Sequence, residues 1–261
     1  MLSGLWRYRS FIVDSVRRDF RARYLNSWLG GFWAIIQPLF MIAIYTIIFG
    51  RLLRVQLPSR ADSLAYVVFL CAGVMTWGLF TEVITRCLQM FIEHASLLKK
   101  ARFPRTALPA IVLLTATLNF GIVFTVLVLF LLTCGRFPGW PLLAFAPLIL
   151  VQQTLALGVG LALGTANVFL RDVGHAATLL LTVWFWLTPI VYPLQILSEE
   201  GRTLLRLNPL TGLVAAYQQV LLTGSWPDWR NLVPALAAAT VALTLGLVTF
   251  RRFEAEMIDH L

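Results

Sequence analysis

The sequence predicts an all-α integral membrane protein, in which six transmembrane helices follow an amphipathic helix that lies on the membrane surface. Hydrophobic residues make up 59% of the 261 residues and charged residues only 13%, whereas a soluble domain carries about 25% charged residues. Six apolar runs are long enough to cross roughly 30 Å of hydrocarbon, which takes about 20 helical residues. An unusually apolar soluble enzyme is the alternative, and the length of these runs disfavours it.

Residues 1–28 are predicted to form the surface helix, because a helical wheel separates their side chains into an apolar and a charged face. A helix of this kind lies in the headgroup region and does not cross the membrane. The apolar face consists of Leu2, Leu5, Trp6, Ile12, Val13, Val16, Phe20 and Tyr24. The charged face consists of Arg7, Asp14, Arg17, Arg18 and Arg21. Arg9 and Arg23 interrupt the apolar face, but their long side chains can reach water from it. Six arginines and the lack of a signal-peptide core indicate that the segment is retained.

The predicted transmembrane helices lie at residues 32–50, 64–90, 107–134, 141–170, 174–193 and 231–250. The third and fourth runs exceed the length that a bilayer requires, so we expect them to tilt or to project from it. Of the 21 lysine and arginine residues, 14 lie in the N-terminal segment, the loops after the second and fourth runs, and the C-terminal tail. The positive-inside rule therefore places both termini in the cytoplasm.

The region 194–230, before the last run, is too apolar for an ordinary soluble loop. Ile190–Leu197 and Leu210–Leu222 are apolar, and proline and glycine residues interrupt them. This pattern predicts short re-entrant helices, which enter the membrane and turn back. Non-helical backbone is tolerated at that depth only beside protein or a water-filled cavity, so such a pair implies a lumen nearby. A surface loop with one amphipathic helix is the alternative. Without a soluble segment or an internal repeat, residues 1–261 form one predicted transmembrane domain.

The sequence holds few groups that could do chemistry. Its two lysines, Lys99 and Lys100, share one loop, and no glycine-rich phosphate loop precedes them, so we expect no ATP site in this chain. The histidines and cysteines lack the spacing of metal ligands. Cys71, Cys87 and Cys134 are expected to be small buried hydrophobic residues. The sequence thus predicts no enzyme, no metal site and no cofactor, and its basic residues orient the chain rather than bind nucleic acid.

One acidic residue approaches the interior of an apolar run. Glu82, toward the far end of the second run, is followed one turn later by Arg86 on the same helix face. Acidic residues inside spans mark proton or ion paths, but an opposite charge at this spacing favours a structural ion pair. An ion-driven transporter is therefore disfavoured, and the energy source is expected in another subunit.

The loop after the second run is the expected docking place for that subunit. From Glu93 to Arg105 it combines helix-forming residues, mixed charge and a proline, which predicts a short helix on the cytoplasmic face. Such a helix would receive motion from a partner and pass it to the second and third spans. The alternative is a purely topological anchor. The docking candidates are Glu93, Lys99, Lys100, Arg102, Arg105, Arg171 and Asp172.

Several strings of residues carry a family resemblance. They are Tyr24–Gly30 leading into Trp33–Leu39, Phe103–Arg105 with Leu108-Pro109, Asn167–Val173, Trp184–Pro193 and Leu207–Gly212. Through them the chain resembles the membrane subunit of type-2 ATP-binding cassette (ABC) exporters of polysaccharides and polyol phosphates. The resemblance implies six spans, an N-terminal interfacial helix, a coupling helix between spans two and three, and re-entrant helices before span six.

The resemblance also implies a function. Two copies of the chain would form a pathway and pair with two copies of a nucleotide-binding ATPase, which binds ATP and Mg²⁺. The substrate would be an undecaprenyl-diphosphate-linked glycan, such as an O-antigen, that crosses a bacterial inner membrane. A teichoic-acid exporter subunit, a multidrug or small-lipid ABC permease, and a scaffold that transports nothing are the alternatives.

This function suggests two sets of site residues. Arg17, Arg18, Arg21 and Arg23 are candidates for the lipid diphosphate, because a guanidinium matches phosphate oxygens; anchoring to headgroups is the alternative. Aromatic faces can stack on the apolar faces of sugars and let a chain slide. The aromatic pathway candidates are Tyr45, Phe49, Trp184, Trp186 and Tyr192. Interface belts and ordinary packing explain such residues as well. Pro38, inside the first span, is expected to bend that helix.

Overall fold

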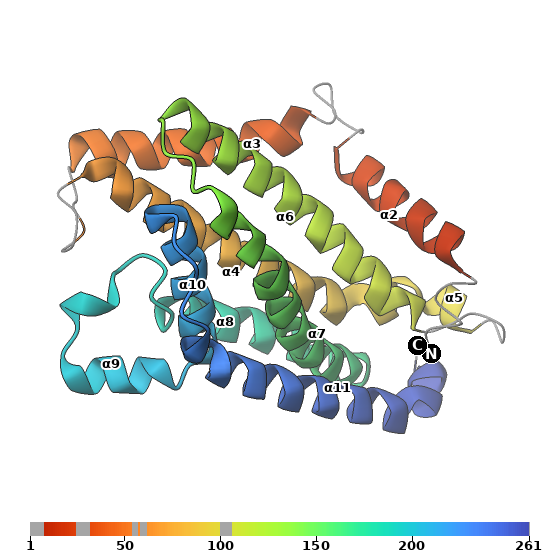
Figure 1. Ribbon diagram of the computed structural model, residues 1–261. Coiled ribbons are helices and arrows are strands. Elements are labelled where there is room, and N and C mark those ends of the chain that lie inside the picture. The colour runs from red at the N-terminus through yellow and green to blue at the C-terminus, as the bar shows by residue number, and fades with distance from the viewer. Residues whose placement is uncertain (1–7, 25–31, 54–56, 58–61, 100–105, 261) are drawn as a thin grey trace.

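The computed structural model describes residues 8–24, 32–53, 57, 62–99 and 106–260. Their fold is all-helical (Figure 1), as the composition predicts. In chain order the helices are α2 (Arg9–Tyr24), α3 (Trp33–Tyr45), η2 (Thr46–Leu52), α4 (Ser63–Glu93), α5 (Ala95–Leu98), α6 (Ala107–Thr133), η3 (Trp140–Ala144), α7 (Phe145–Phe169), α8 (Asp172–Trp186), η4 (Leu194–Ile196), α9 (Glu199–Arg206), α10 (Pro209–Thr223), η5 (Trp229–Leu232) and α11 (Val233–His260).

Five stretches of the described residues are long and apolar enough to cross a membrane. They are Trp33–Gly50, Leu64–Glu93, Ala107–Thr133, Trp140–Phe169 and Trp229–Met257. They agree with five of the six predicted spans to within a few residues at most ends. The last differs most, because α11 continues as one helix about three turns beyond the predicted end at residue 250. Helix α3 likewise continues through Pro38, which is buried.

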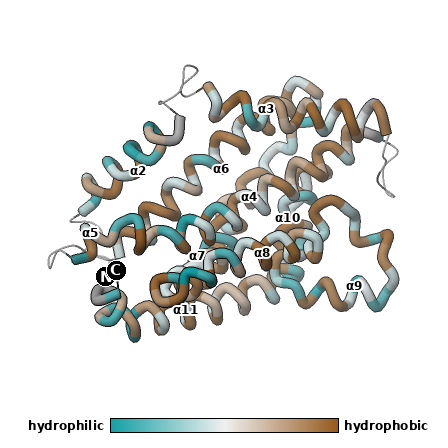
Figure 2. Tube along the Cα trace, turned by 180° about the vertical axis from the view of Figure 1, so that it is seen from behind, coloured by the Kyte–Doolittle hydropathy of each residue, from teal (hydrophilic) through white to brown (hydrophobic). Residues whose placement is uncertain are grey.

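Helix α4 is the centre of the bundle, since α3, α6, α7, α8 and α10 all contact it. Figure 1 shows the start of α2, the short α5 and the end of α11 together at one end of the molecule, and α9 at the opposite end. Hydrophobic residues run along α3, whereas hydrophilic residues gather in α2 and near the end of α11 (Figure 2). The structure therefore has a charged end, which corresponds to the predicted cytoplasmic side.

Helices α7 and α11 cross in close contact because two glycines meet there. A Cβ atom on Gly158 would lie 2.3 Å from the backbone carbon of Ala242, and one on Gly246 would lie 2.3 Å from the backbone oxygen of Gly158. Small residues at a helix crossing let two backbones approach closely, which is how membrane helices gain packing energy in the absence of a hydrophobic drive.

Helix α4 begins at a cap that also joins it to α6. The side chain of Asp62 accepts a hydrogen bond from the backbone N–H of Leu64 at 3.0 Å, and an acidic cap stabilises a helix start. The same carboxylate forms an ion pair with Arg136, which lies just beyond the end of α6. The ends of these two helices are thus held together away from the charged end.

The predicted fifth span, 174–193, is not one continuous helix. Helix α8 has 15 residues and ends at Trp186. Pro189 follows Thr188, and a residue before proline is disfavoured in helical conformation. The chain then turns without regular structure to Pro193. Apolar composition alone does not show where such a run stops being helical, which explains the difference from the prediction.

The region 194–230 contains two helices of different character. Helix α10 is buried along most of its length, whereas α9 has no buried residues. Asn208 connects α10 to the end of α8: its side chain caps Leu210, accepts from the indole N–H of Trp184 at 3.0 Å, and donates to the backbone oxygen of Leu187 at 3.1 Å. One side chain therefore holds the start of α10 against the end of α8.

Candidate functional site

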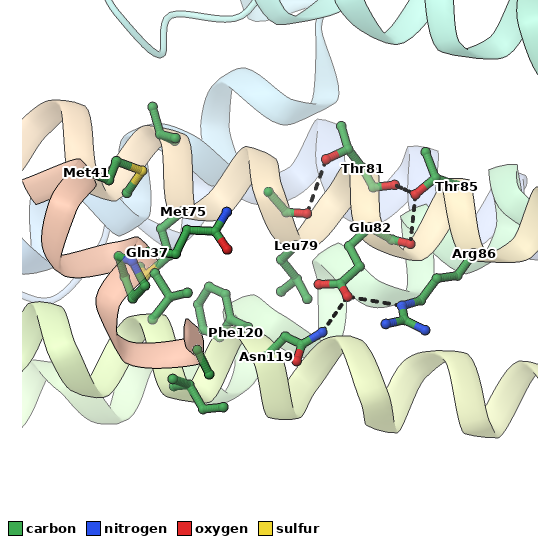
Figure 3. Close-up of a pocket in the computed structure, with 16 residues that line it drawn as sticks. Gln37, Met41, Met75, Leu79, Thr81, Glu82, Thr85, Arg86, Asn119 and Phe120 are labelled. Carbon is green, nitrogen blue, oxygen red and sulfur yellow. Dashed lines mark hydrogen bonds and ion pairs between the residues drawn. The ribbon is translucent and has the colours of Figure 1, made fainter. Parts of the chain in front are cut away.

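A cleft of about 600 Å³ lies between α3, α4 and α6 (Figure 3). Its apolar part is lined by Met41 of α3, Met75 of α4 and Phe120 of α6. Its polar part contains Glu82 and Arg86, one turn apart on α4. The cleft therefore combines an apolar wall with a charged cluster inside a span, which is where membrane proteins place functional groups.

Glu82 is the centre of the charged cluster. Its Oε1 atom accepts hydrogen bonds from Nε of Arg86, at 3.0 Å, and from Nδ2 of Asn119 on α6. Arg86 also reaches Asp19 of α2, with 3.7 Å between Nη1 and Oδ2. The expected pair of Glu82 and Arg86 is present, and two further side chains extend it into a link between α2, α4 and α6.

The polar end of the cleft is rich in acceptors. Among the described side chains of the cluster, the carboxylates of Glu82 and Asp19 face the single guanidinium of Arg86. The Oδ1 atom of Asn119 is buried and has no hydrogen-bond partner within the described part of the chain. A buried carbonyl oxygen in this state can take a donor from a bound molecule or water.

A smaller cavity of about 210 Å³ adjoins the cleft on the side of the charged end. Thr85 and Arg86 line both, and the smaller cavity continues to Glu93 and His94 at the end of α4. The Nδ1 atom of His94 lies 3.0 Å from the backbone oxygen of Met90. The Glu82 cluster therefore lies between the two hollows.

The docking candidates gather at the charged end as far as the structure describes them. Glu93 at the end of α4 and Lys99 after α5 are exposed, as are Arg171 and Asp172 between α7 and α8. The side chain of Asn167 donates to the backbone oxygen of Leu88 and accepts from the backbone N–H of Gly174, so the start of α8 lies beside the last turns of α4. Helix α5 has only four residues. Lys100, Arg102 and Arg105 lie outside the described residues.

The arginine candidates for a lipid diphosphate lie on the exposed side of α2. Arg17, Arg18 and Arg21 are all exposed, while the side chain of Arg23 lies outside the described part. Arg18 donates to Oγ of Ser15 at 2.7 Å and lies over the ring of Phe11, 5.8 Å from its centroid. The Arg18 side chain is thus engaged within α2 itself.

Two of the aromatic pathway candidates pack inside the protein at the end of the first span that lies away from the charged end. The ring of Phe49 lies between those of Tyr45 and Tyr66, with centroids 6.1 and 5.6 Å apart. The hydroxyl of Tyr66 donates to the backbone oxygen of Val191 at 2.7 Å. These rings join η2, α4 and the segment after α8, which agrees with the packing alternative.

The other three aromatic candidates surround the end of α8. The ring of Trp184 packs edge to face on Phe80 with centroids 5.3 Å apart, and its indole N–H is taken by Asn208. Tyr192 donates its hydroxyl hydrogen to the backbone oxygen of Trp186 at 2.8 Å. Trp186 itself is 61% exposed, whereas Trp184 and Tyr192 are half-buried.

A polar stripe on α4 did not figure among the predicted site residues. Gly78, Thr81, Thr85 and Gln89 recur every three or four residues, and all four are exposed or half-buried. Figure 3 shows Thr81 and Thr85 on one side of α4, while Glu82 points to the other side toward Asn119. The helical spacing of threonines within an apolar run is a signal that could have found this stripe from the sequence.

Comparison with known proteins places the chain in a family. Residues 13–222 match the ABC-2 type transporter family. The chain belongs to this family. It is 31% identical over 245 residues to the O-antigen export system permease protein RfbA of Myxococcus xanthus, across 93% of this chain and 92% of the relative. A protein of the same name from Klebsiella pneumoniae is 31% identical over 244 residues, with the same coverage. The polysialic acid transport protein KpsM of Escherichia coli is 23% identical and aligned over 92% of each chain.

The ABC-2 transporter match covers the whole site. Every residue that lines the cleft and the smaller cavity lies within the matched range. Helix α11, which closes the bundle against α7, lies beyond it. Two of these relatives are permease proteins by name. The ABC-2 transporter family and the apolar helices identify this chain as a multi-pass membrane protein.

Proposed function

We propose that this chain is the transmembrane subunit of an ATP-driven exporter that moves lipid-linked polysaccharide across a bacterial inner membrane. The observation that carries the proposal is the alignment with two O-antigen export permeases at 31% identity. The alignment covers 93% of this chain and 92% of each relative. The substrate would be an undecaprenyl-diphosphate-linked glycan of the O-antigen kind. A distant polysaccharide transporter aligned over the same length supports the polymer class rather than one sugar.

The energy would come from a separate nucleotide-binding subunit, present in two copies and holding ATP and Mg²⁺. The sequence has no phosphate loop, and its two lysines are adjacent in one loop. Two copies of this chain would share the pathway. The exposed apolar side chains of α3 and α8, including Phe40, Leu179 and Leu180, support a second copy, because they leave large apolar surfaces beside polar ones.

The chain would cross the membrane six times, as the proposal requires, if α8 and the residues that follow it form one membrane crossing. A helix of 15 residues is about 22 Å long, and the segment to Val191 would cover the rest. Helix α10, which is buried beside α4, would then be a re-entrant element before the last span. This order places both termini and α5 in the cytoplasm, and the end of α6 on the outer side.

Cysteine labelling tests this topology without adding any residue. Cys71 and Cys87 are buried, whereas Cys134, just after α6, is partly exposed. In intact spheroplasts we expect a membrane-impermeant maleimide to label Cys134 and to leave the other two unlabelled, as measured by mass spectrometry of tryptic peptides. Inverted vesicles serve as the control and should protect Cys134. Labelling of Cys134 only in inverted vesicles would reverse the proposed orientation.

Helix α4 would transmit the motion of the ATPases. It runs without interruption from the outer cap at Asp62 to Glu93, beside the docking loop. Through Arg86 it is also joined to Asp19 on α2. Closure of the ATPases would therefore move the cytoplasmic ends of α4 and α2 together, and the Glu82 link to Asn119 would carry the movement to α6.

Reconstitution with the ATPase encoded beside this chain tests the function. We expect ATP-dependent export of glycan into inverted vesicles, and no hydrolysis by this chain alone. Replacing Arg102 and Arg105 with glutamate should leave hydrolysis in place and lower export at least about tenfold, because reversed charge disrupts complementary docking. Glu199→Lys on the exposed α9 is the control for a charge change elsewhere. Hydrolysis by the isolated chain would refute the proposal, and normal coupling in the double variant would refute the docking site.

Two other substrates fit the same architecture less well. A teichoic-acid exporter would share the fold, and a multidrug or small-lipid permease would share the superfamily. The names of the full-length relatives favour glycan export over both. Genes for glycosyltransferases next to this gene would support the same choice, and their replacement by polyol-phosphate polymerases would support the first alternative.

A further inference from the structure

Helices α4 and α8 lie side by side and run antiparallel between two contacts. At one end the ring of Trp77 meets Phe185, with centroids 5.7 Å apart. At the other end Asn167 ties the backbone of Leu88 to that of Gly174, through hydrogen bonds of 2.9 and 2.8 Å. Both helices rise by the same distance per residue. The two contacts therefore also set which residues of α4 and α8 lie at the same level between them. One turn in from the aromatic contact, Thr81 corresponds to Thr182. A turn further, Thr85 corresponds to Thr178.

These four threonines share one hydrogen-bonding state. Each hydroxyl donates to a backbone oxygen four residues earlier on its own helix, at distances of 2.8 to 3.0 Å. The hydroxyl hydrogen is therefore engaged, and the oxygen presents only lone pairs outward. Thr81 is half-buried and the other three are exposed. The two rows thus form a surface of hydrogen-bond acceptors and methyl groups.

Within the described part of the chain, the surface also carries no unpaired charge along its middle. The charged side chains beside it on α4 are Glu82 and Arg86, which pair with each other and turn toward Asn119. From Val173 to Trp186, His175 is the one titratable residue of α8, and it lies near the charged end. A stretch about two turns long therefore separates the cytoplasmic charges from the exposed ring of Trp186.

The threonines of α8 lie at the edge of its exposed face that is nearest α4. At 100° per residue, Thr178 and Thr182 fall within about 60° of Phe185, whose ring meets Trp77 of α4. Trp186 and the 67% exposed Leu179 follow them around the helix. Leu180 and Val183 are 63% and 50% exposed and lie further around. The buried side contains Ala177 and Leu181. Thr178 and Thr182 therefore lie between the buried side of α8 and its exposed aliphatic residues, on the side of α4.

We propose that the paired threonine rows of α4 and α8 form the wall along which the exported glycan slides, and that this wall selects an uncharged polyhydroxyl chain. The inference rests on the proposed export function. Sugar hydroxyls donate to the threonine oxygens, and because each acceptor is weak and repeats about every turn, the chain exchanges contacts without being held. A polyanion finds no donor here and meets oxygen lone pairs instead. The wall therefore also disfavours polyol phosphates.

Photo-crosslinking tests the contact directly. A benzophenone amino acid is placed at Thr85, Thr178 or Thr182, with Leu180 and Val183 as matched controls on the same helix. Inverted vesicles contain the chain, its partner ATPase and an undecaprenyl-diphosphate-linked polymannose as the probe. We expect ATP-dependent glycan adducts at the threonine positions and at least about fivefold fewer at the controls, which face another surface. Equal adducts at the controls, or none at the threonines while polymannose is exported, would overturn the wall.

Two further arms separate the parts of the proposal. The triple variant Thr85→Val, Thr178→Val, Thr182→Val keeps shape but removes the acceptors, and should slow export roughly tenfold; the triple Thr→Ser variant keeps the acceptors and should export at the normal rate. An equal rate in both would refute the role of the hydroxyls. Equally strong adducts with polysialic acid on the same lipid carrier would refute selection for an uncharged chain. Absence of export in the unmodified chain would instead refute the proposed function itself.

Discussion

Replacing Gly158 or Gly246 with alanine is expected to prevent most of the chain from reaching its folded state. The added Cβ would lie 2.3 Å from backbone atoms of the facing helix in either case, and a backbone cannot move aside as a side chain can. Helices α7 and α11 would have to separate along their shared face. Forcing extra carbon atoms into a packed core costs about 1–3 kcal/mol, and a rigid backbone contact lies at the upper end of this range. The measurement is the yield of monodisperse fluorescent fusion protein on size-exclusion chromatography in mild detergent.

Gly121→Ala is the matched control for this experiment. Gly121 also lies within a membrane-length helix, α6, but a Cβ there meets no atom within 4 Å. Its yield should therefore equal that of the unmodified protein, while that of Gly158→Ala and Gly246→Ala falls to a small fraction. If all three variants gave the same profile, the close crossing of α7 and α11 would not be a feature of the folded chain.

The positions of most helices could be predicted because lipid imposes a simple rule on local sequence. An apolar run of sufficient length must satisfy its backbone internally, and a helix does so. The rule gives no account of which helices touch. The contact of Gly158 with Gly246 joins two runs that lie far apart in the chain, and the local sequence of one run does not show that the other is its partner. The break after Trp186 required attention to a single Thr188-Pro189 step, which composition does not register.

For the candidate site, too, the sequence predicts local features but not the contacts between helices. Glu82 and Arg86 are one turn apart, so their pairing follows from helix geometry. Their further partners, Asn119 and Asp19, come from other helices, and nothing in the local pattern indicates them. The aromatic residues illustrate the opposite difficulty. Trp184 is an aromatic residue of the kind expected to line a pathway. Its ring instead packs on Phe80, and its indole N–H donates to Asn208. Which face of a helix is free depends on its neighbours.

Replacing Arg86 with leucine is expected to lower the thermal stability of the chain, and a second substitution is expected to restore it. The change removes the guanidinium that lies 3.0 Å from the Glu82 carboxylate, which is largely withdrawn from solvent inside a span. Removing one partner of a fully buried pair costs about 3–5 kcal/mol. The side chains here are 25% and 19% exposed, so a loss of about 2 kcal/mol is expected, or roughly 5 °C in the unfolding midpoint.

The double variant Glu82→Gln, Arg86→Leu separates a structural pair from a site that needs its charges. Glutamine keeps an acceptor for Asn119 and carries no charge, so the double variant should recover most of the unfolding midpoint in differential scanning fluorimetry. Gln89→Leu, an exposed position one turn further along α4, controls for the added leucine. Export by the same double variant then decides between these two roles of the pair. Restored stability with normal export identifies Glu82 and Arg86 as a structural link between α2, α4 and α6, whereas restored stability with lost export shows that the charges in the cleft act on the transported molecule or on the motion that moves it.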